Sequence, residues 1–255
     1  IHLFPARYRF GATATAFRND NLSWFIEAYC GRKFCTITDE ELEQSNLLIK
    51  PKLIVRHTDF KFNVNFNYRN WYMTVMKYLV KDKRRNALIC KDIINNSIKR
   101  RRLALVVSTS VNHCNYIAKG LQALDPGIRV GFLTEIRGGS GLSWKNVVTE
   151  NVERLASAGK LDVVFGVNRV KQGLDISPIE DVYTIAPRKS KVDVTQIIGR
   201  CMRPDKCFGK YKDKSDKKPC VYDYVDHKIQ VFAEQFKNYR LPVYEERCII
   251  ERSKK

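Results

Sequence analysis

The segment RLALVVSTSVNHCNYIAKGLQAL, residues 102–124, decides the fold class of this chain. Its first part, residues 102–110, contains five consecutive apolar residues, which is typical of a short strand buried on both faces. Its second part, residues 111–124, has the apolar spacing of a helix. A buried strand that passes directly into a helix is the repeating unit of a parallel sheet, because parallel strands must be joined by crossover connections.

The same unit recurs along the chain. Further strands are predicted at residues 128–134, 161–167, 182–187 and 220–226, and further helices at residues 84–100, 146–160 and 192–203. Because short apolar strands alternate with helices, we predict an α/β fold with a parallel sheet that is covered by helices on both faces. Such a sheet binds its ligands at the carboxyl ends of its strands.

The first 80 residues follow this pattern less clearly. The segment at residues 47–58 is rich in apolar residues but is interrupted by Pro51, so it suits an edge strand or a linker. The acidic run DEEL, residues 39–42, is typical of the first turn of a helix capped by Thr38. Residues 60–78 are aromatic and polar, and their apolar residues show no regular helical or strand spacing.

The composition favours an anionic partner. The 255 residues include 46 Lys and Arg against 27 Asp and Glu, which gives a formal net charge of +19. Nucleic acid is the commonest polyanion that binds such a protein. No apolar run approaches the length of a membrane span, and the first residues lack the pattern of a signal peptide. We therefore expect a nucleic-acid partner, no membrane, and a cytoplasmic or nuclear location.

The eight cysteines are scattered along the chain, which is typical of reduced thiols in a cytosol-like compartment. Four residues of types that bind zinc lie close together in the sequence, namely Cys201, Cys207, Cys220 and His227. Their spacings include no CxxC pair. We therefore expect free cysteines and no metal site.

The segment QIIGRCMRP, residues 196–204, gathers polar side chains for an anion. On a helix, residues three and four apart share one face, so Gln196, Arg200 and Arg203 are predicted to lie together. Gly199 permits the close approach of a backbone or a phosphate, and the proline at the end of the segment stops the helix. Two guanidinium groups repel each other unless an anion lies between them. The segment therefore calls for a phosphate or a carboxylate, or else forms a solvated surface.

Four segments, in the right order, resemble the conserved motifs of superfamily 2 helicases. GATATAFRND (residues 11–20) is similar to motif III, VVSTSVNHC (106–114) to motif IV, VNRVKQGLDI (167–176) to motif V and QIIGRCMRP to motif VI. The resemblance is greatest to the DExH branch, which includes DNA-repair translocases, restriction motors and phage relatives. Motif III departs from the family pattern, since Ala12 replaces a leucine and Ala16 a proline.

The resemblance implies a RecA-like fold. It assigns residues 1–50 to the end of the first RecA-like lobe, 51–83 to a linker or insertion, 84–230 to the C-terminal lobe and 231–255 to a C-terminal tail. No GxxxxGK[ST] sequence for binding phosphates is present, and DEEL follows motif III where the family's acidic box precedes it. We therefore expect that the rest of the first lobe lies outside this chain.

The resemblance also implies roles for individual residues at a nucleotide. Arg200 and Arg203 occupy the arginine-finger positions and would reach the γ-phosphate of ATP, which the other lobe would hold with Mg²⁺. Gln196 would help to position them. Asp175 would accept a hydrogen bond from the ribose, and Gly173 would let the backbone come close.

Further residues would respond to the nucleotide or contact nucleic acid. Thr13 and Thr15 would couple the nucleotide state to closure of the lobes. The residues implied to hold the backbone of a nucleic acid, without regard to base sequence, are Ser108, Thr109, Ser110, Thr134 and Arg169.

The sequence thus predicts the C-terminal motor lobe of an ATP-dependent helicase or translocase, with DNA as the expected partner in preference to RNA. The chain alone is expected to be inactive as an ATPase. Two alternatives remain at this point: a nucleic-acid-binding module with a RecA-like lobe and no motor activity, and the motor part of a restriction enzyme.

Overall fold

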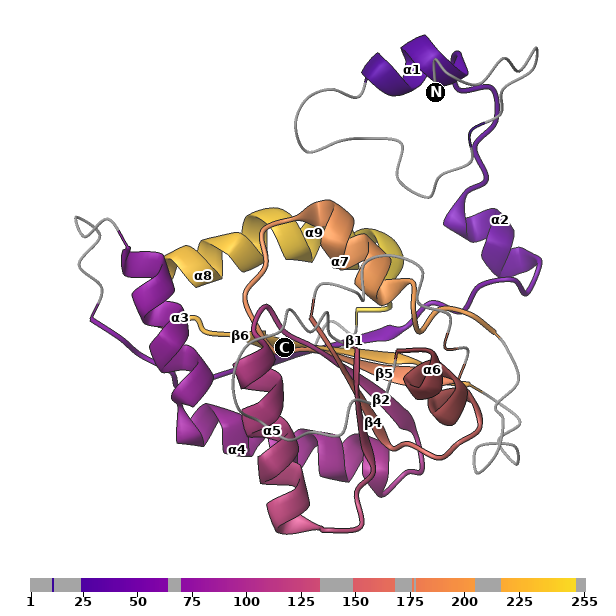
Figure 1. The fold of residues 1–255 in the computed structure, drawn as a ribbon. Helices are drawn as coiled ribbons and strands as arrows, with labels where there is room; N and C mark the ends of the chain where they lie inside the picture. Colours follow the sequence, from indigo (N-terminus) through magenta and orange to yellow (C-terminus); the bar gives the residue numbers. More distant parts are fainter. Residues whose placement is uncertain are drawn as a thin grey trace.

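The structure is a computed structural model that describes residues 11, 24–63, 70–133, 149–167, 176, 178–204 and 217–250. Six strands form one sheet in the order β1-β6-β5-β2-β4-β3, and every neighbouring pair is parallel (Figure 1). The predicted α/β fold with a parallel sheet is therefore confirmed. The strands are β1 (Lys52–His57), β2 (Leu103–Val107), β3 (Val130–Leu133), β4 (Val163–Gly166), β5 (Ile179–Thr184) and β6 (Cys220–Val225).

Helices surround the sheet. They are α1 (Trp24–Cys30), α2 (Asp39–Gln44), α3 (Trp71–Lys81), α4 (Lys83–Ile93), α5 (Val111–Leu124), α6 (Thr149–Ser157), α7 (Lys191–Ile198), α8 (Gln230–Gln235) and α9 (Leu241–Arg247). Two π-helical segments, η1 (Ile94–Ile98) and η4 (Phe236–Arg240), continue α4 and α8. α1 stands apart from the layers around the sheet (Figure 1).

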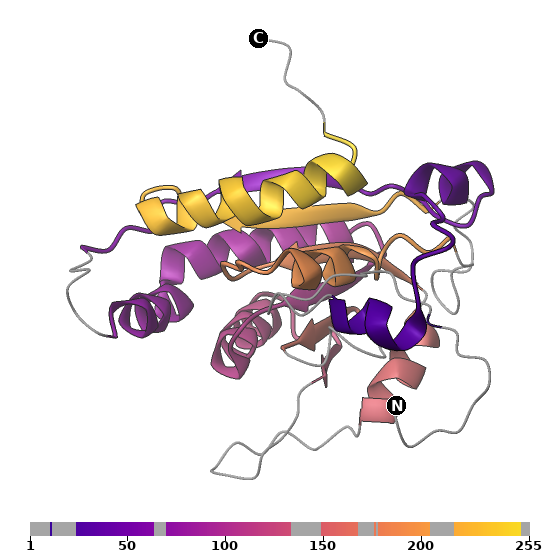
Figure 2. The ribbon, with the colours of Figure 1, turned by 90° about the horizontal axis from the view of Figure 1, so that it is seen from above.

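Each face of the sheet carries its own hydrophobic core. α7 and α9 lie over one face and α4 and α5 over the other (Figures 1 and 2). All five residues of β2 are fully buried, because β2 lies inside the sheet and is covered on both faces. Burying each of its large apolar side chains stabilises the fold by about 1.5–3 kcal/mol. This explains why the segment at residues 102–110 carried so clear a strand pattern.

Most predicted elements from residue 84 onward overlap those of the structure, and the helix predicted at residues 111–124 has the bounds of α5. The strand predicted at residues 182–187 is displaced, because β5 begins and ends three residues earlier. The helix predicted to residue 203 is wrong beyond Ile198, where Gly199 forms the C-cap of α7. The amides of Arg200 and Cys201 bond to the carbonyls three residues before them instead of four, at 3.2 and 3.1 Å. Glycine favours such an end because it is a poor helix former. Gln196 and the two arginines therefore do not share one helical face.

Of the two possibilities predicted for residues 47–58, an edge strand and a linker, the structure shows the strand: β1 belongs to the sheet, so residues 52–57 are not part of a linker or insertion. Among the named strands of the structure β1 pairs only with β6. Its other side is bonded at its first residues to Ile249, whose amide donates to the Pro51 carbonyl at 2.8 Å and whose carbonyl accepts from the Leu53 amide at 3.0 Å. Proline tolerates this position because it immediately precedes an edge strand.

The helices α3, α8 and α9 were not predicted from the sequence. α3 packs Val75 and Leu79 against Phe232 of α8, in a cluster that also contains residues following β5 and β6. η4 is held by Arg240, whose buried Nε lies 2.7 Å from Asp223 Oδ2, and the hydroxyl of Tyr244 donates to the same oxygen at 2.9 Å. Residues 230–247 are thus a packed layer of the fold.

The acidic run at residues 39–42 begins α2, as interpreted. The Thr38 hydroxyl accepts a hydrogen bond from the Glu41 amide at 3.2 Å, and the Glu41 carboxylate accepts one from the Thr38 amide at 2.8 Å. This reciprocal pair is a capping box. The similarity of DEEL to an acidic box of a nucleotide-binding site therefore has a purely local explanation.

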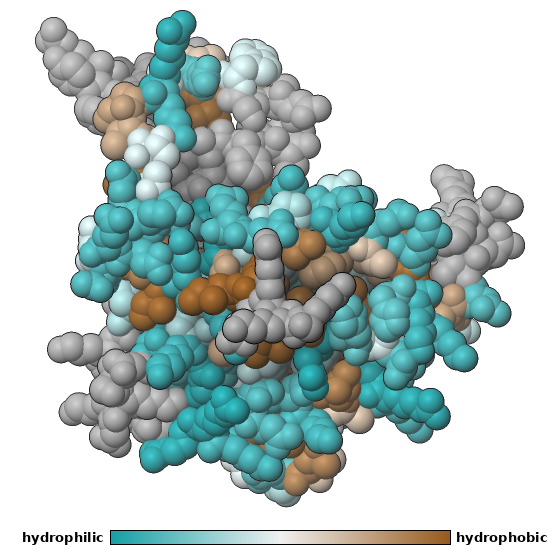
Figure 3. Space-filling model, turned by 180° about the vertical axis from the view of Figure 1, so that it is seen from behind, coloured by the Kyte–Doolittle hydropathy of each residue, from teal (hydrophilic) through white to brown (hydrophobic). Residues whose placement is uncertain are grey.

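Most of the surface seen from behind is hydrophilic, with hydrophobic side chains gathered across the middle (Figure 3). This agrees with the high content of Lys and Arg. Among the residues described above, no helix combines the length and the apolar character that crossing a membrane requires.

Candidate functional site

The predicted contact residues fall into two groups at opposite ends of the sheet. The Met202 carbonyl accepts a hydrogen bond from the Ile49 amide at 2.8 Å, and the Arg203 carbonyl accepts one from Lys217 Nζ at 2.7 Å. Ile49 and Lys217 lie just before β1 and β6, so the arginine pair is at the amino ends of the strands. Residues 108–110 follow β2 at the carboxyl ends. A nucleotide at the arginine pair would therefore not occupy the carboxyl edge, where such a sheet binds its own ligands.

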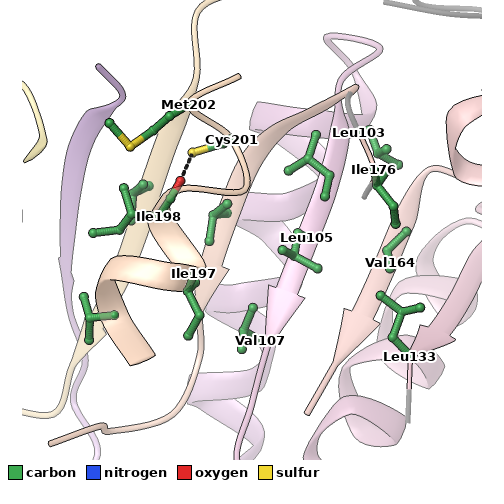
Figure 4. Packing of buried hydrophobic residues seen from close by; sticks show 14 of the residues in the cluster. Leu103, Leu105, Val107, Leu133, Val164, Ile176, Ile197, Ile198, Cys201 and Met202 are labelled. Carbon is green, nitrogen blue, oxygen red and sulfur yellow. Dashed lines mark hydrogen bonds between the residues drawn. The ribbon is translucent and has the colours of Figure 1, made fainter. Parts of the chain in front are cut away.

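Two buried residues hold the backbone of the arginine pair. Cys201 and Met202, which lie between the arginines, are 0% and 3% exposed and belong to the core beneath α7. Figure 4 shows both side chains beside Ile198, near the Leu103 end of β2. The Cys201 thiol donates to the Ile198 carbonyl at 3.2 Å. The arginine positions are therefore fixed on the sheet through their neighbours in sequence.

The polar side chains around this anchor reach the surface to different degrees. Gln196 and Arg200 are partly buried, and Arg203 is exposed. Guanidinium groups bind phosphate and carboxylate oxygens, which is the chemistry that the sequence predicted for this segment. The described part of the chain contains no group of three or more His, Cys, Asp or Glu residues that fits a metal ion.

Gly199 is not required by the fold around it. Its φ is −54°, which any residue adopts, and an added Cβ would lie 3.4 Å from the nearest described atom, the Thr195 carbonyl oxygen. The packing of the described chain therefore leaves room for a side chain here. A need for glycine would have to come from a group outside the described residues that approaches this turn.

At the carboxyl end of β2, the three predicted contact residues differ in burial. Ser108 is fully buried, and its hydroxyl lies 3.1 Å from His113 Nδ1 and accepts a hydrogen bond from the Ser110 amide at 3.3 Å. Thr109 is exposed and Ser110 is partly buried just before α5. Thr109 therefore faces solvent and Ser110 is partly accessible, whereas Ser108 shapes the turn that carries them.

Two residues that the sequence analysis did not single out hold this turn. His113 is buried and bonded through Nε2 to the Asn86 side-chain oxygen at 3.2 Å. Burial, together with the nearby Arg85 charge, lowers its pKa well below the usual 6.5, so the ring is neutral near pH 7. From the other side, Arg188 Nη2 donates to the Ser108 carbonyl at 2.8 Å. The position of His113 on the buried face of a predicted helix was the available signal for the first of these contacts.

The remaining predicted contact residues lie outside the described residues. These are Thr13, Thr15, Thr134, Arg169, Gly173 and Asp175. Of the four residues considered for zinc, Cys207 also lies outside them. Cys201 and Cys220 are free thiols, and the His227 ring packs edge to face against that of His57.

The comparisons with known proteins support the fold. No protein-family model matches the chain, and no curated protein matches it in sequence. Its structure is similar to a fragment of an HsdR-type subunit of a type I restriction enzyme from Vibrio vulnificus YJ016, with a TM-score of 0.63 and 16% identity over 94% of this chain. It is also similar to UvsW of phage T4, with a TM-score of 0.51 and 17% identity over 79% of the chain.

A third similar structure is the ATP-dependent type ISP restriction-modification enzyme LlaBIII bound to DNA, with a TM-score of 0.50 and 12% identity over 88% of this chain. The chain spans 42%, 41% and 17% of the lengths of these three structures. These neighbours are proteins of the superfamily 2 helicase type. At these identities the similarity shows the fold alone, and it agrees with the predicted RecA-like α/β fold.

Proposed function

We propose that this chain is the C-terminal RecA-like lobe of an ATP-dependent nucleic-acid helicase or translocase. The observation that carries the proposal is the pair Arg200 and Arg203, set on either side of two buried residues at the amino ends of the strands. In the proposed protein, ATP and Mg²⁺ are held mainly by a first lobe that packs against this end of the sheet.

Arg200 and Arg203 would stabilise the charge that develops on the transferred phosphoryl group. Such stabilisation is effective only when the donors are already in position before the reaction, because their reorganisation then costs little. The anchor formed by Cys201 and Met202 supports this role, since it fixes the backbone of both arginines. Gln196, on the last turns of α7, would orient them, and Gly173 and Asp175 would contact the sugar.

Nucleic acid would bind at the other end of the sheet. Thr109 and Ser110 offer hydroxyl groups beside the start of α5, whose first amide groups point toward the same side. Backbone contacts of this kind do not depend on base sequence. Thr134 and Arg169 would extend the contact, and Thr13 and Thr15 would couple it to the nucleotide. We propose DNA as the partner in preference to RNA.

The test is Arg203→Ala in the full-length protein, measured as ATP hydrolysis stimulated by nucleic acid. Loss of an arginine finger lowers kcat by about a thousandfold or more, whereas binding of single strands should persist. Lys191→Ala is the matched control, because Lys191 is an exposed cation at the other end of α7. Hydrolysis at the wild-type rate in Arg203→Ala would exclude the arginine-finger role, whereas a wild-type protein that binds nucleic acid but hydrolyses no ATP would leave the nucleic-acid-binding module. The chain alone should show no ATPase activity.

A second candidate function is the motor of a restriction enzyme. It is favoured by the similarity to the HsdR-type subunit over 94% of this chain and to LlaBIII over 88%. A restriction motor would require a nuclease in the same protein or complex. DNA cleavage that depends on ATP hydrolysis would support this candidate, and hydrolysis with strand separation but without cleavage would exclude it.

A further inference from the structure

An open pocket lies at the carboxyl end of the edge strand β1, away from residues 108–110. Its volume is about 460 Å³, which is large enough for a nucleotide-sized group. One wall is formed by His57, Thr58 and the residues that follow them, and the other by the first turn of α4 with Arg84 and Arg85. None of these residues belongs to the motifs from which the function above was proposed.

The floor of the pocket is a neutral, fixed ion pair. Arg85 Nε and Nη2 donate to the two carboxylate oxygens of Asp226 at 2.7 and 3.1 Å, and both side chains are fully buried. The Thr58 hydroxyl donates to the same carboxylate, and Arg85 Nη1 donates to the Ile185 carbonyl at 2.9 Å. These bonds join β1, β5, β6 and α4, so the pocket does not depend on a mobile segment for its shape.

The rim carries an excess of positive charge. Lys61 and Arg84 are exposed, and neither has an ion-pair partner among the residues that the structure describes. The acidic residue Asp59 is bonded to Lys228 at 2.5 Å, so its charge is already balanced. The other carboxylate, Asp82, caps α4 by accepting a hydrogen bond from the Arg85 amide at 2.7 Å. One cation on the rim is therefore left in excess, and an anion fits the opening.

Aromatic rings stand beside these cations. The exposed rings of His57 and His227 pack edge to face with centroids 5.4 Å apart. Phe60 is buried in the same wall. Flat rings beside cations are the combination that single-stranded nucleic acids use, because bases stack on the rings while phosphates meet the charges.

We propose that this pocket binds a backbone phosphate of a single-stranded nucleic acid, through Lys61 and Arg84. The inference rests on the proposed function, because it assumes that a strand follows the carboxyl edge of the sheet. β1 lies three strand positions from β2, which is about 14 Å at the usual spacing. A strand held at residues 109–110 would therefore reach the pocket within the several nucleotides that such sites cover.

The experiment measures binding of fluorescein-labelled dT20 to this chain over a range of salt concentrations. We compare Lys61→Ala/Arg84→Ala with the control Lys91→Ala/Arg100→Ala, which removes one exposed lysine and one exposed arginine that do not line the pocket. The pocket variant should lose about tenfold in affinity at low salt. Its slope of log K against log salt should fall by about 0.7 for each lost phosphate contact. In the control variant, the changes in affinity and in slope should each be at most about half of those in the pocket variant.

Three results would overturn the inference. The first is that the pocket variant binds dT20 with the wild-type affinity and salt dependence. The second is that both double variants lose affinity equally, because net charge alone would then account for the effect. The third is that the wild-type protein does not bind dT20 even at low salt, which would also refute the proposed function. Both variants change exposed side chains, so their thermal unfolding should match that of the wild type. Arg84→Lys, which keeps the charge, should retain most of the affinity.

Discussion

Asp226→Asn should destabilise the protein strongly, although it changes a single charge at constant shape. Asp226 accepts two hydrogen bonds from Arg85 and one from Thr58, and the ion pair is fully buried. The asparagine would leave the Arg85 guanidinium buried with no anionic partner. It would also face Arg85 with an amide group in place of one carboxylate oxygen.

The expected magnitude follows from the burial of both partners. Breaking a buried pair by neutralising one member costs about 3–5 kcal/mol, because the remaining charge is uncompensated in a medium of low polarity. For a chain of 255 residues, each kcal/mol lowers the melting temperature by about 2–4 °C, so Asp226→Asn should melt about 6–20 °C below the wild type.

The assay is urea unfolding at 25 °C followed by tryptophan fluorescence, with Asp59→Asn as the matched control. Asp59 also loses one carboxylate charge at the same edge of the sheet, but its side chain is 83% exposed. Exposed pairs contribute about 0–1 kcal/mol. If Asp226→Asn lowers the free energy of unfolding by less than about 1 kcal/mol, or by no more than the control does, Arg85 and Asp226 do not form a buried ion pair beneath the pocket.

Three further predictions concern the interior. Burial lowers the pKa of His113, so its ring stays neutral in the folded protein and takes up a proton only in the unfolded chain. The free energy of unfolding should therefore fall by up to about 1.4 kcal/mol per pH unit below about pH 6.5. His113→Gln should remove this contribution to the pH dependence in unfolding curves measured from pH 4.5 to 8. Gly131→Ala should lower the free energy of unfolding by about 1–3 kcal/mol, because the new methyl group would lie 2.7 Å from a leucine side chain and 3.0 Å from a valine side chain. Gly199→Ala should leave the free energy of unfolding unchanged or raise it by up to about 1 kcal/mol. Equal urea midpoints for the two variants would contradict this difference. Among the described cysteines, the exposed Cys35 should react first with a thiol reagent at pH 8, because burial raises the pKa of the Cys90 thiol to about 11; labelling followed by peptide mass analysis would show the opposite order if this is wrong.

Local chemistry explains what the sequence predicted correctly. The run at residues 103–107 is buried on both faces, and a strand inside a parallel sheet needs only apolar residues, so the composition of a few neighbours was sufficient. The capping box at Thr38 depends on residues three apart, whereas Pro51 left an edge strand and a linker both possible for residues 47–58. α3 was missed because its polar and aromatic residues obscure the period, although Val75 and Leu79 lie one turn apart and are both buried.

Contacts between distant segments decided the rest. No local pattern shows that Ser108 turns its hydroxyl to His113 while Thr109 faces solvent, or that the chain leaves the helix at Gly199 to bury Cys201 and Met202. The pocket beside β1 is lined by residues from 57–61 and 82–88, and Asp226 and Lys228 bond to residues of this lining; only the tertiary structure brings these segments together. The sequence by itself determined the class of fold and the candidate arginines, because periodicity and motif spacing are properties of neighbouring residues. The tertiary structure alone decided which polar groups are buried and which ends of the sheet they occupy, because burial depends on packing between elements that are far apart in the chain.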